Sequence, residues 1–297
     1  MNDPAVPQTI PLNHLDRMPW AWTSAPCRAL GHMFSVRTND RALGDYLASV
    51  LGSLVAMVPP AHMYSLIDRG EQTTQRYALF GNEKRLVFSE SGSRVLSTML
   101  WYVNHRALEW SHDLLLFHAG VVESDGRALL FPAHMEAGKT TLVAGLVRAG
   151  LRYLSDELAA VDMDSLIVRP FPKALSIDVG SWRVLADLAP TVDPDVERRY
   201  LGSTWHVDPR RIRSHAVAPA SMPAFVIAPM YRPERPSELV PMTRADAVML
   251  LCQNSFNATV HGRSGIEACA ALARRSRCYR LFVGDLDSAC RLVLDLL

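Results

Sequence analysis

The chain has 297 residues, about twice the length of a typical domain, which predicts two domains. Its 31 basic and 30 acidic side chains leave a net charge of +1, so there is no bulk positive field that would favour binding to nucleic acid. Hydrophobic residues make up 49% of the chain and charged residues 21%, a balance that predicts a sizeable core and excludes general disorder.

The sequence also lacks the marks of a membrane or metal protein. Its N-terminus has no basic stretch followed by an apolar one, and its most apolar stretch, residues 46–60, is too short to span a membrane and ends in two prolines. The five cysteines form no C-x-x-C pair and the histidines no H-E-x-x-H motif, which predicts reduced thiols and no zinc site. We therefore expect a cytoplasmic protein outside the membrane.

Residues 1–110 predict a small α+β module whose chemistry the sequence does not indicate. The first 25 residues, rich in proline, asparagine and aspartate, are typical of an arm on the surface. Apolar residues at helical spacing predict a helix over residues 41–58, which two prolines terminate. Three short alternating runs then predict a β-meander, and residues 91–110 predict a second helix.

Residues 111–297 predict an α/β domain with a central sheet. Two apolar runs joined by Asp125-Gly126 predict a β-hairpin, because this dipeptide favours the tight turn between paired strands. Helices and strands then alternate, as is typical of helices packed on a sheet. The predicted elements are a helix over 141–148, a strand over 153–162, a Pro-rich connection over 169–177, a strand over 223–231, helices over 244–253 and 265–275, a strand over 278–283 and a helix over 287–296.

A phosphate-binding loop is predicted between the hairpin's second strand and the helix that follows. The pattern Ala/Gly-x-x-x-x-Gly-Lys-Ser/Thr is matched by Ala133, His134, Met135, Glu136, Ala137, Gly138, Lys139 and Thr140, and Thr141 continues the nucleotide contacts. Phosphate oxygens need several converging backbone N–H groups, which a loop that enters a helix supplies together with the helix dipole. Gly138 would let the main chain approach, Lys139 would reach the β- and γ-phosphates, and Thr140 would offer its hydroxyl to Mg²⁺.

Two residues of the loop depart from this chemistry. Ala133 stands where the stricter pattern has glycine, so the freedom to adopt a positive φ is lost. Glu136 adds a carboxylate, which is harmless if it faces outward and weakens phosphate binding if it faces inward. The alternative interpretation is an ordinary strand–turn–helix that contains Gly-Lys-Thr by chance.

The hairpin, the loop and a later acidic pair together resemble the catalytic domain of the bacterial HPr kinase/phosphorylase family. The resemblance rests on His118-Ala119-Gly120-Val121, Ala137-Gly138-Lys139-Thr140 and Tyr153-Leu154-Ser155-Asp156-Glu157, and covers roughly residues 117–162. It implies a P-loop kinase domain of the HPr kinase/PEP carboxykinase-like type with a mixed sheet, and assembly into homo-oligomers. The family's second signature, a Glu-Ile-Arg-Gly-type stretch, is absent, so phosphorolysis and recognition of HPr itself do not follow.

The resemblance further implies a kinase that uses ATP and Mg²⁺, with a role for each matching residue. Asp156 would take the proton from a serine hydroxyl as it attacks the γ-phosphate, and Glu157 would help to hold Mg²⁺ or position the nucleophile. His118 would lie beside the phosphates as a polar or cationic partner. These roles suit phosphoryl transfer, which depends on positioning and charge neutralisation. From the residues alone, the acidic pair also suits a polar strand end, and His118 a hydrogen-bonded core histidine.

The acceptor is less defined. Arg169 and Lys173 in the Pro-rich connection are candidate contacts to an anionic substrate or to the nucleotide, although basic residues in such loops are usually solvated. The resemblance suggests a serine of a peptide or small protein. Two alternatives stay open: a nucleotide-binding adaptor with a degenerate loop that transfers nothing, and a kinase that acts on a small metabolite.

Overall fold

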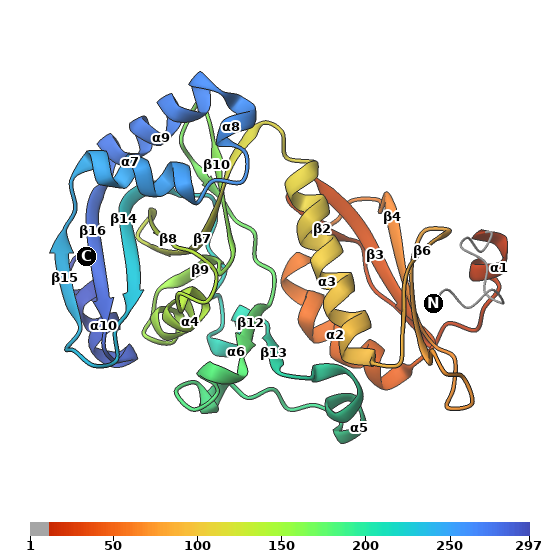
Figure 1. Ribbon diagram of the computed structural model, residues 1–297. Coiled ribbons are helices and arrows are strands. Elements are labelled where there is room, and N and C mark those ends of the chain that lie inside the picture. The colour runs from red at the N-terminus through yellow and green to blue at the C-terminus, as the bar shows by residue number, and fades with distance from the viewer. Residues whose placement is uncertain (1–11) are drawn as a thin grey trace. The chain divides into compact units, whose positions relative to one another are not determined.

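The computed structural model describes residues 12–297, whose contacts divide the chain into two compact units (Figure 1). The first unit holds the described residues up to Trp110 together with a returning segment, Thr191–Thr204. The second holds Ser111–Pro190 and Trp205–Leu297. The return of Thr191–Thr204 was not predicted. Because of it, the chain passes between the units three times, after Trp110, after Pro190 and after Thr204.

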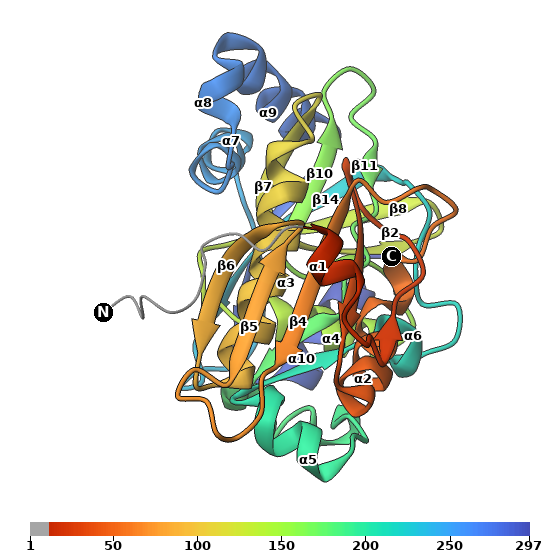
Figure 2. The ribbon, with the colours of Figure 1, turned by 90° about the vertical axis from the view of Figure 1, so that its right-hand side faces the viewer.

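The first unit is built on a six-stranded sheet of order β1-β3-β4-β5-β6, with β2 also paired to β3. Strands β3 and β4 run parallel, and the other neighbours run antiparallel. Helix α3 packs across the sheet, as Figure 2 shows. The elements are α1 (Leu12–Asp16), β1 (Trp22–Thr23), β2 (Cys27–Ala29), β3 (His32–Thr38), α2 (Arg41–Leu51), β4 (His62–Asp68), β5 (Tyr77–Gly81), β6 (Lys84–Ser89), α3 (Gly92–Glu109) and, in the returning segment, α5 (Pro194–Val196).

The predicted meander and second helix of this unit are confirmed, and so is the first helix, although it ends at Leu51 instead of residue 58. The predicted surface arm is wrong where the structure describes it. Residues 1–11 lie outside the described part of the chain. Beyond them, Leu15 of α1 is completely buried and shares a core cluster with Ile67 and Phe80. Strand β1 pairs with β3. Leu15 stands between polar neighbours and is not part of a periodic apolar pattern, so the sequence did not predict that it is buried.

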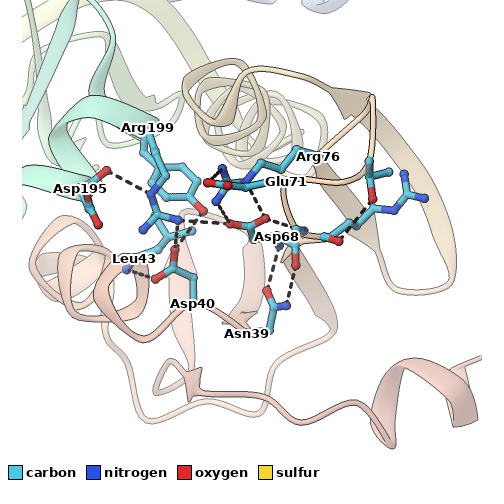
Figure 3. Close-up of polar contacts among 12 residues, drawn as sticks. Asn39, Asp40, Leu43, Asp68, Glu71, Arg76, Asp195 and Arg199 are labelled. Carbon is cyan, nitrogen blue, oxygen red and sulfur yellow. Dashed lines mark hydrogen bonds and ion pairs between the residues drawn. The ribbon is translucent and has the colours of Figure 1, made fainter.

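The returning segment is held to the first unit by a network of charges, drawn in Figure 3. The Arg199 guanidinium lies 2.7 Å from the Asp40 carboxylate and 3.2 Å from that of Asp68. Asp40 also caps the N-terminus of α2 and accepts from the hydroxyl of the buried Tyr200 at 3.2 Å. Arg76 binds Asp68 from the other side at 2.8 Å. Each of these two partly exposed acids is therefore matched by at least one guanidinium.

The second unit is a mixed α/β domain, as predicted. Its eight-stranded sheet has the order β11-β10-β7-β8-β14-β16-β15, with β9 also paired to β7. Strands β8, β14 and β16 run parallel, and the remaining pairs run antiparallel. The elements are β7 (Leu114–Ser124), β8 (Arg127–Pro132), α4 (Lys139–Arg148), β9 (Arg152–Ser155), β10 (Leu158–Asp162), β11 (Val168–Arg169), β12 (Leu175–Asp178), β13 (Thr204–Val207), α6 (Pro209–Ile212), β14 (Met222–Tyr231), β15 (Glu238–Pro241), α7 (Arg244–Gln253), α8 (Ala258–His261), α9 (Arg263–Arg275), β16 (Arg277–Val283) and α10 (Leu286–Leu294).

Both faces of this sheet are buried. Leu129 and Phe131 of β8 join a core cluster that contains residues of α4 and α10, whereas Ala128 and Leu130 join a second cluster with α7 and α9. Because successive side chains of a strand point to opposite faces, β8 must be apolar throughout, and its sequence reads as one apolar run. Strand β8 is thereby fixed between two layers of helices, with its carboxyl end leading into the predicted loop.

Two local features decide where the candidate site forms. The hairpin of β7 and β8 is confirmed, and its turn has the positive φ angles that Asp125 and Gly126 favour, 50° and 78°. The predicted strand over 153–162 is instead two strands, β9 and β10, which both pair with β7 and are separated by Asp156 and Glu157. The acidic pair therefore lies at a break in the sheet. Among the described residues, no helix is long and apolar enough to cross a membrane.

Candidate functional site

The predicted phosphate-binding motif forms the loop between β8 and α4, and two of its residues adopt a left-handed backbone conformation with positive φ. Gly138 caps the N-terminus of α4 at a φ of 80°, and a Cβ there would touch nothing, so glycine is favoured for its backbone conformation alone. Glu136 also has a positive φ, 62°, and its side chain is exposed. Ala133 is not among the described residues with a positive φ. The alanine in place of glycine therefore imposes no backbone strain.

Lys139 is buried against the loop from which it projects. Its Nζ donates to the carbonyl of Ala133 at 2.9 Å and to that of His134 at 2.6 Å. Burial lowers the pKa of Lys139 to about 8, although the carboxylates of Glu157 and Asp156 act in the opposite direction. The loop thus brings one ammonium group and the N-terminal N–H groups of α4 to the same place, an arrangement that suits a phosphate anion.

The Asp156 carboxylate is enclosed by donors. Oδ1 accepts from the Tyr153 hydroxyl at 2.8 Å and lies 2.8 Å from Lys173 Nζ. Oδ2 accepts from the Thr140 hydroxyl and from the Ser176 N–H, both at 3.1 Å. Burial by itself would raise the pKa of Asp156, but Lys173 and the hydrogen bonds outweigh it and hold that pKa below its ordinary value. A carboxylate offers about four acceptor positions, and here all four are taken.

Glu157 lies in a different environment from its neighbour. Its side chain is 43% exposed, compared with 1% for Asp156. Lys173 Nζ lies 3.3 Å from Glu157 Oε2, so one ammonium group bridges the two acids. Burial by itself would lower the pKa of Lys173, but the two carboxylates raise it above its ordinary value. Lys173 is therefore a buried cation that orients the acidic pair, and of the two acids Glu157 is the one that solvent reaches.

His118 lies in β7, opposite Leu158 of β10, and its carbonyl accepts from the Ala133 N–H at 3.3 Å. Burial and the nearby Lys139 and His134 lower the pKa of His118 to about 4. The expectation that it could act as a cationic partner of phosphate is therefore not supported at neutral pH. It is present as a neutral, polar ring.

Arg169 does not join the site. Its guanidinium lies 2.7 Å from Asp162 and 4.0 Å from Asp113, at the end of β10 remote from Glu157. Because Arg169 pairs with aspartates at that end of the sheet, its guanidinium lies away from the site. A substrate contact through Arg169, one of the two proposed in the Pro-rich connection, has no support in its position, whereas Lys173 reaches both candidate acids.

Two residues near the site, His206 and Ser181, were not found from the sequence. His206 in β13 is buried near Lys173 and Asp156, and burial, followed by the charge of Lys173, lowers its pKa to about 4. Ser181 lies with its Oγ 2.6 Å from the Oγ1 of Thr141. His206 follows the returning segment in the chain, and no local pattern marks it as a neighbour of the loop.

A cleft of about 650 Å³, here called the loop cleft, lies beside residues 132–137, which form the first part of the phosphate loop. It is lined by residues 132–137, the carboxyl end of β14 and one side of α7. Strands β8 and β14 are parallel, so both end at this edge, where α/β sheets commonly bind ligands. Four methionines line it, and two of them, Met135 and Met249, are 79% and 59% exposed. The cleft is large enough for a nucleoside.

Among the described residues, no group of three or more histidine, cysteine, aspartate or glutamate side chains is placed to hold a metal ion. Neither the protein-family models nor the curated proteins include a match to this chain.

Proposed function

We propose that this chain is an ATP- and Mg²⁺-dependent phosphotransferase of the HPr-kinase-like type, which transfers the γ-phosphate to a hydroxyl, with the serine of a peptide or small protein as acceptor. One observation carries the proposal: Lys139, Thr140 and the two acids converge where β8 ends and α4 begins. A strand, a glycine-capped loop and a helix in this order are the context that the motif requires for phosphate binding.

The residues present are compatible with nucleotide-bound magnesium. Mg²⁺ keeps several waters and is usually held by one or two carboxylates together with substrate phosphates, so a cluster of three protein ligands is not needed. The Thr140 hydroxyl donates to Asp156 at 3.1 Å, an orientation that would leave the lone pairs of Thr140 Oγ1 for such an ion. Bound magnesium would neutralise charge that develops on the transferred phosphoryl group.

The remaining contacts to the nucleotide follow from the loop. Its backbone N–H groups and the N-terminus of α4 would hold the phosphates, and Lys139 would exchange its two carbonyl partners for phosphate oxygens. The apolar walls of the loop cleft, including Met135 and Met249, would pack against the nucleoside.

For the proton transfer we propose roles opposite to those that the family resemblance implies. A base needs an accessible acceptor position, and Asp156 has a lowered pKa and four donors. Glu157 is half-exposed and oriented by Lys173. We therefore assign acceptance of the hydroxyl proton to Glu157, and to Asp156 the positioning of the Thr140 hydroxyl, through which it would act on magnesium.

Binding and turnover measured on the same variants test this function. With a fluorescent ATP analogue, Lys139→Ala is expected to weaken binding at least ten-fold, and Asp156→Asn is expected to lose the dependence of binding on Mg²⁺. Glu157→Gln is expected to keep the affinity but lower ATP turnover by about 10²- to 10⁴-fold, the usual contribution of a general base. Glu267→Gln, on an exposed face of α9, serves as the matched control.

Each alternative gives a different result. If the protein binds no nucleotide with Mg²⁺ present, the proposal is wrong. If it binds ATP but neither hydrolyses it nor transfers phosphate, the adaptor alternative is supported. If Asp156→Asn rather than Glu157→Gln abolishes turnover at unchanged Mg²⁺-dependent binding, the kinase stands and our exchange of roles is wrong.

A further inference from the structure

A short loop between α7 and α8 lies against β7 at the point where β8 leaves that strand. Strand β8 pairs with β7 from the hairpin turn to Ala119, which faces Pro132, and the chain then enters the phosphate loop. Nearer the start of β7, the place of β8 is taken by the short loop, whose Ser255 forms an isolated antiparallel bridge with Phe117. We call this loop the β7 platform, and it consists of Asn254, Ser255, Phe256 and Asn257.

The β7 platform is fixed to β7 by hydrogen bonds of its backbone and its side chains. The Phe256 N–H donates to the Leu116 carbonyl at 2.9 Å, and the His118 N–H donates to the Asn254 carbonyl at 2.7 Å. The Asn257 side chain pairs with β7 as a neighbouring strand would. Its Oδ1 accepts from the Leu116 N–H at 2.9 Å, and its Nδ2 donates to another carbonyl of β7 at 2.8 Å. Phe256 therefore projects from a backbone that is already ordered, which lowers the entropic cost of binding to it.

The Phe256 side chain is exposed and lies beside the candidate site. It is 48% exposed, whereas the other phenylalanines of the chain, all of them described, are buried or partly buried. Its ring centroid lies 5.8 Å from that of His118. The His118 ring is in turn near enough to Lys139 and Asp156 for their charges to act on its pKa in opposite directions. One histidine side chain thus connects the exposed ring with the groups at the phosphate loop.

Phe256 is outside the cleft in which we place the nucleoside. The loop cleft is lined by α7 as far as Gln253, and neither Phe256 nor His118 is part of its lining. On the other side, His118 faces Leu158 of β10, the residue after Glu157. Neighbouring strands lie ~4.8 Å apart, so Phe256 and Glu157 are separated by roughly 10 Å, which an extended peptide spans in about three residues.

Building on the proposed function, we propose that Phe256 is a specificity-determining residue that selects acceptors with an apolar side chain, best an aromatic one, within about three residues of the phosphorylated serine. That side chain packs on the Phe256 ring while the serine hydroxyl lies at Glu157. Two rings in contact gain from their edge-to-face or offset geometry in addition to the burial of apolar surface.

The transfer step itself is that of the proposed function. The serine oxygen forms a bond to the γ-phosphorus, the bond from that phosphorus to the β–γ bridging oxygen breaks, the hydroxyl proton passes to Glu157, and ADP leaves. Phe256 touches none of these atoms in this scheme. Its contact is with a side chain of the acceptor outside the reacting group, so its loss is expected to affect KM for the peptide more than kcat.

The test uses the full chain, Mg²⁺, ATP labelled at the γ-phosphate and peptides with a single serine. Each peptide has phenylalanine at one of the three positions before or after the serine, and the parent peptide has glycine at all of them. Phenylalanine at one or more positions is expected to raise kcat/KM about ten-fold, mainly through KM. Phe256→Ala is expected to remove this preference and Phe256→Leu to keep part of it. Neither should change the affinity for ATP or its hydrolysis without peptide.

The matched control is Val184→Ala. Val184 is also 48% exposed, and its carbonyl accepts from Arg148 at the end of α4 remote from the phosphate loop. This variant should keep the preference for phenylalanine. Equal transfer to the phenylalanine peptides and the parent would overturn the inference, as would a preference that survives in Phe256→Ala. If Phe256→Ala lowers ATP affinity as much as it lowers transfer, Phe256 serves the nucleotide and the inference is also wrong.

Failure of the inference and failure of the proposed function give different results. If the natural chain hydrolyses ATP but phosphorylates no peptide of the set, the assignment of Phe256 is wrong while the nucleotide chemistry stands. If the natural chain binds no ATP with Mg²⁺ present, the proposed function is wrong and the assignment falls with it.

Discussion

In the first unit, Asp40 and Asp68 are held by arginines, whereas in the second unit Asp156 is held by Lys173. Guanidinium is charged at every accessible pH and binds a carboxylate through a fixed fork, while an ammonium group is a point charge on a flexible stem whose pKa depends strongly on its surroundings. The arginine network fastens the returning segment to its unit. The lysine network keeps two acids beside a loop that is suited to phosphate.

The same distinction occurs within the second unit. Glu123 in β7 is completely buried and is bound by Arg152, at the end of β7 that lies beside the hairpin turn. His118, Lys139 and the acidic pair lie toward the opposite end of β7. Arginine therefore serves an acid outside the site and lysine serves the acids within it, which indicates that the choice of cation follows the role of the acid.

The largest effect is expected from Lys173→Met. It leaves Asp156 and Glu157 without their shared cation, and removal of one partner from a buried ion pair costs about 3–5 kcal/mol of unfolding free energy. Urea denaturation measures this loss. The double variant Lys173→Met with Asp156→Asn should recover a large part of it, because no buried charge is then left unpaired. If the single variant is as stable as the natural chain, Lys173 does not hold the acids.

A smaller loss, about 2 kcal/mol, is expected from Arg199→Met. The acids that it serves are slightly exposed, and Asp68 keeps Arg76, so solvent and a second arginine offset part of the effect. Limited proteolysis should show faster cleavage within Thr191–Thr204 while turnover stays measurable. Arg198→Met, which removes an exposed pair next to it, should leave stability within about 0.5 kcal/mol. Equal effects of the two variants would show that the Arg199 network does not fasten the segment.

The smallest effect concerns pH. The pKa of Lys139 is lowered to about 8, so its ammonium form, which phosphate requires, is lost as the pH rises above that value. Nucleotide affinity should then fall by up to about ten-fold per pH unit, equivalent to about 1.4 kcal/mol. In Lys139→Arg the cation stays charged, and whatever affinity remains should not change between pH 7 and pH 9. A natural chain with constant affinity over that range would contradict the prediction.

Local patterns predicted the parts of the site that are close in sequence. Asp125-Gly126 predicted the hairpin, and Gly138 with Lys139 predicted the loop, because a few adjacent residues determine each conformation. Arg169 and Lys173 could not be told apart, since both are basic residues of one Pro-rich connection. Only the pairing of strands shows that one reaches a surface aspartate and the other the buried Asp156.

The rest depends on contacts between distant segments. Asp156 and Glu157 were predicted inside one strand, and the break between β9 and β10 becomes visible only once both strands are paired with β7. His206 reaches the site through β13, whose partner β12 lies on the other side of the returning segment in the chain. Such neighbours leave no trace in local composition or periodicity.

The path of the chain also limits how the molecule can be divided. A fragment that starts at Ser111 would include Arg199, Tyr200 and Leu201 but lack the acids and the apolar surface that cover them. A fragment that ends at Trp110 would leave Asp40 and Asp68 without Arg199. One cut therefore damages both halves. A fragment of the second unit that aggregates would therefore reflect the surface exposed on residues 191–204, whereas replacing those residues by a short flexible linker removes that surface and tests whether the second unit folds by itself.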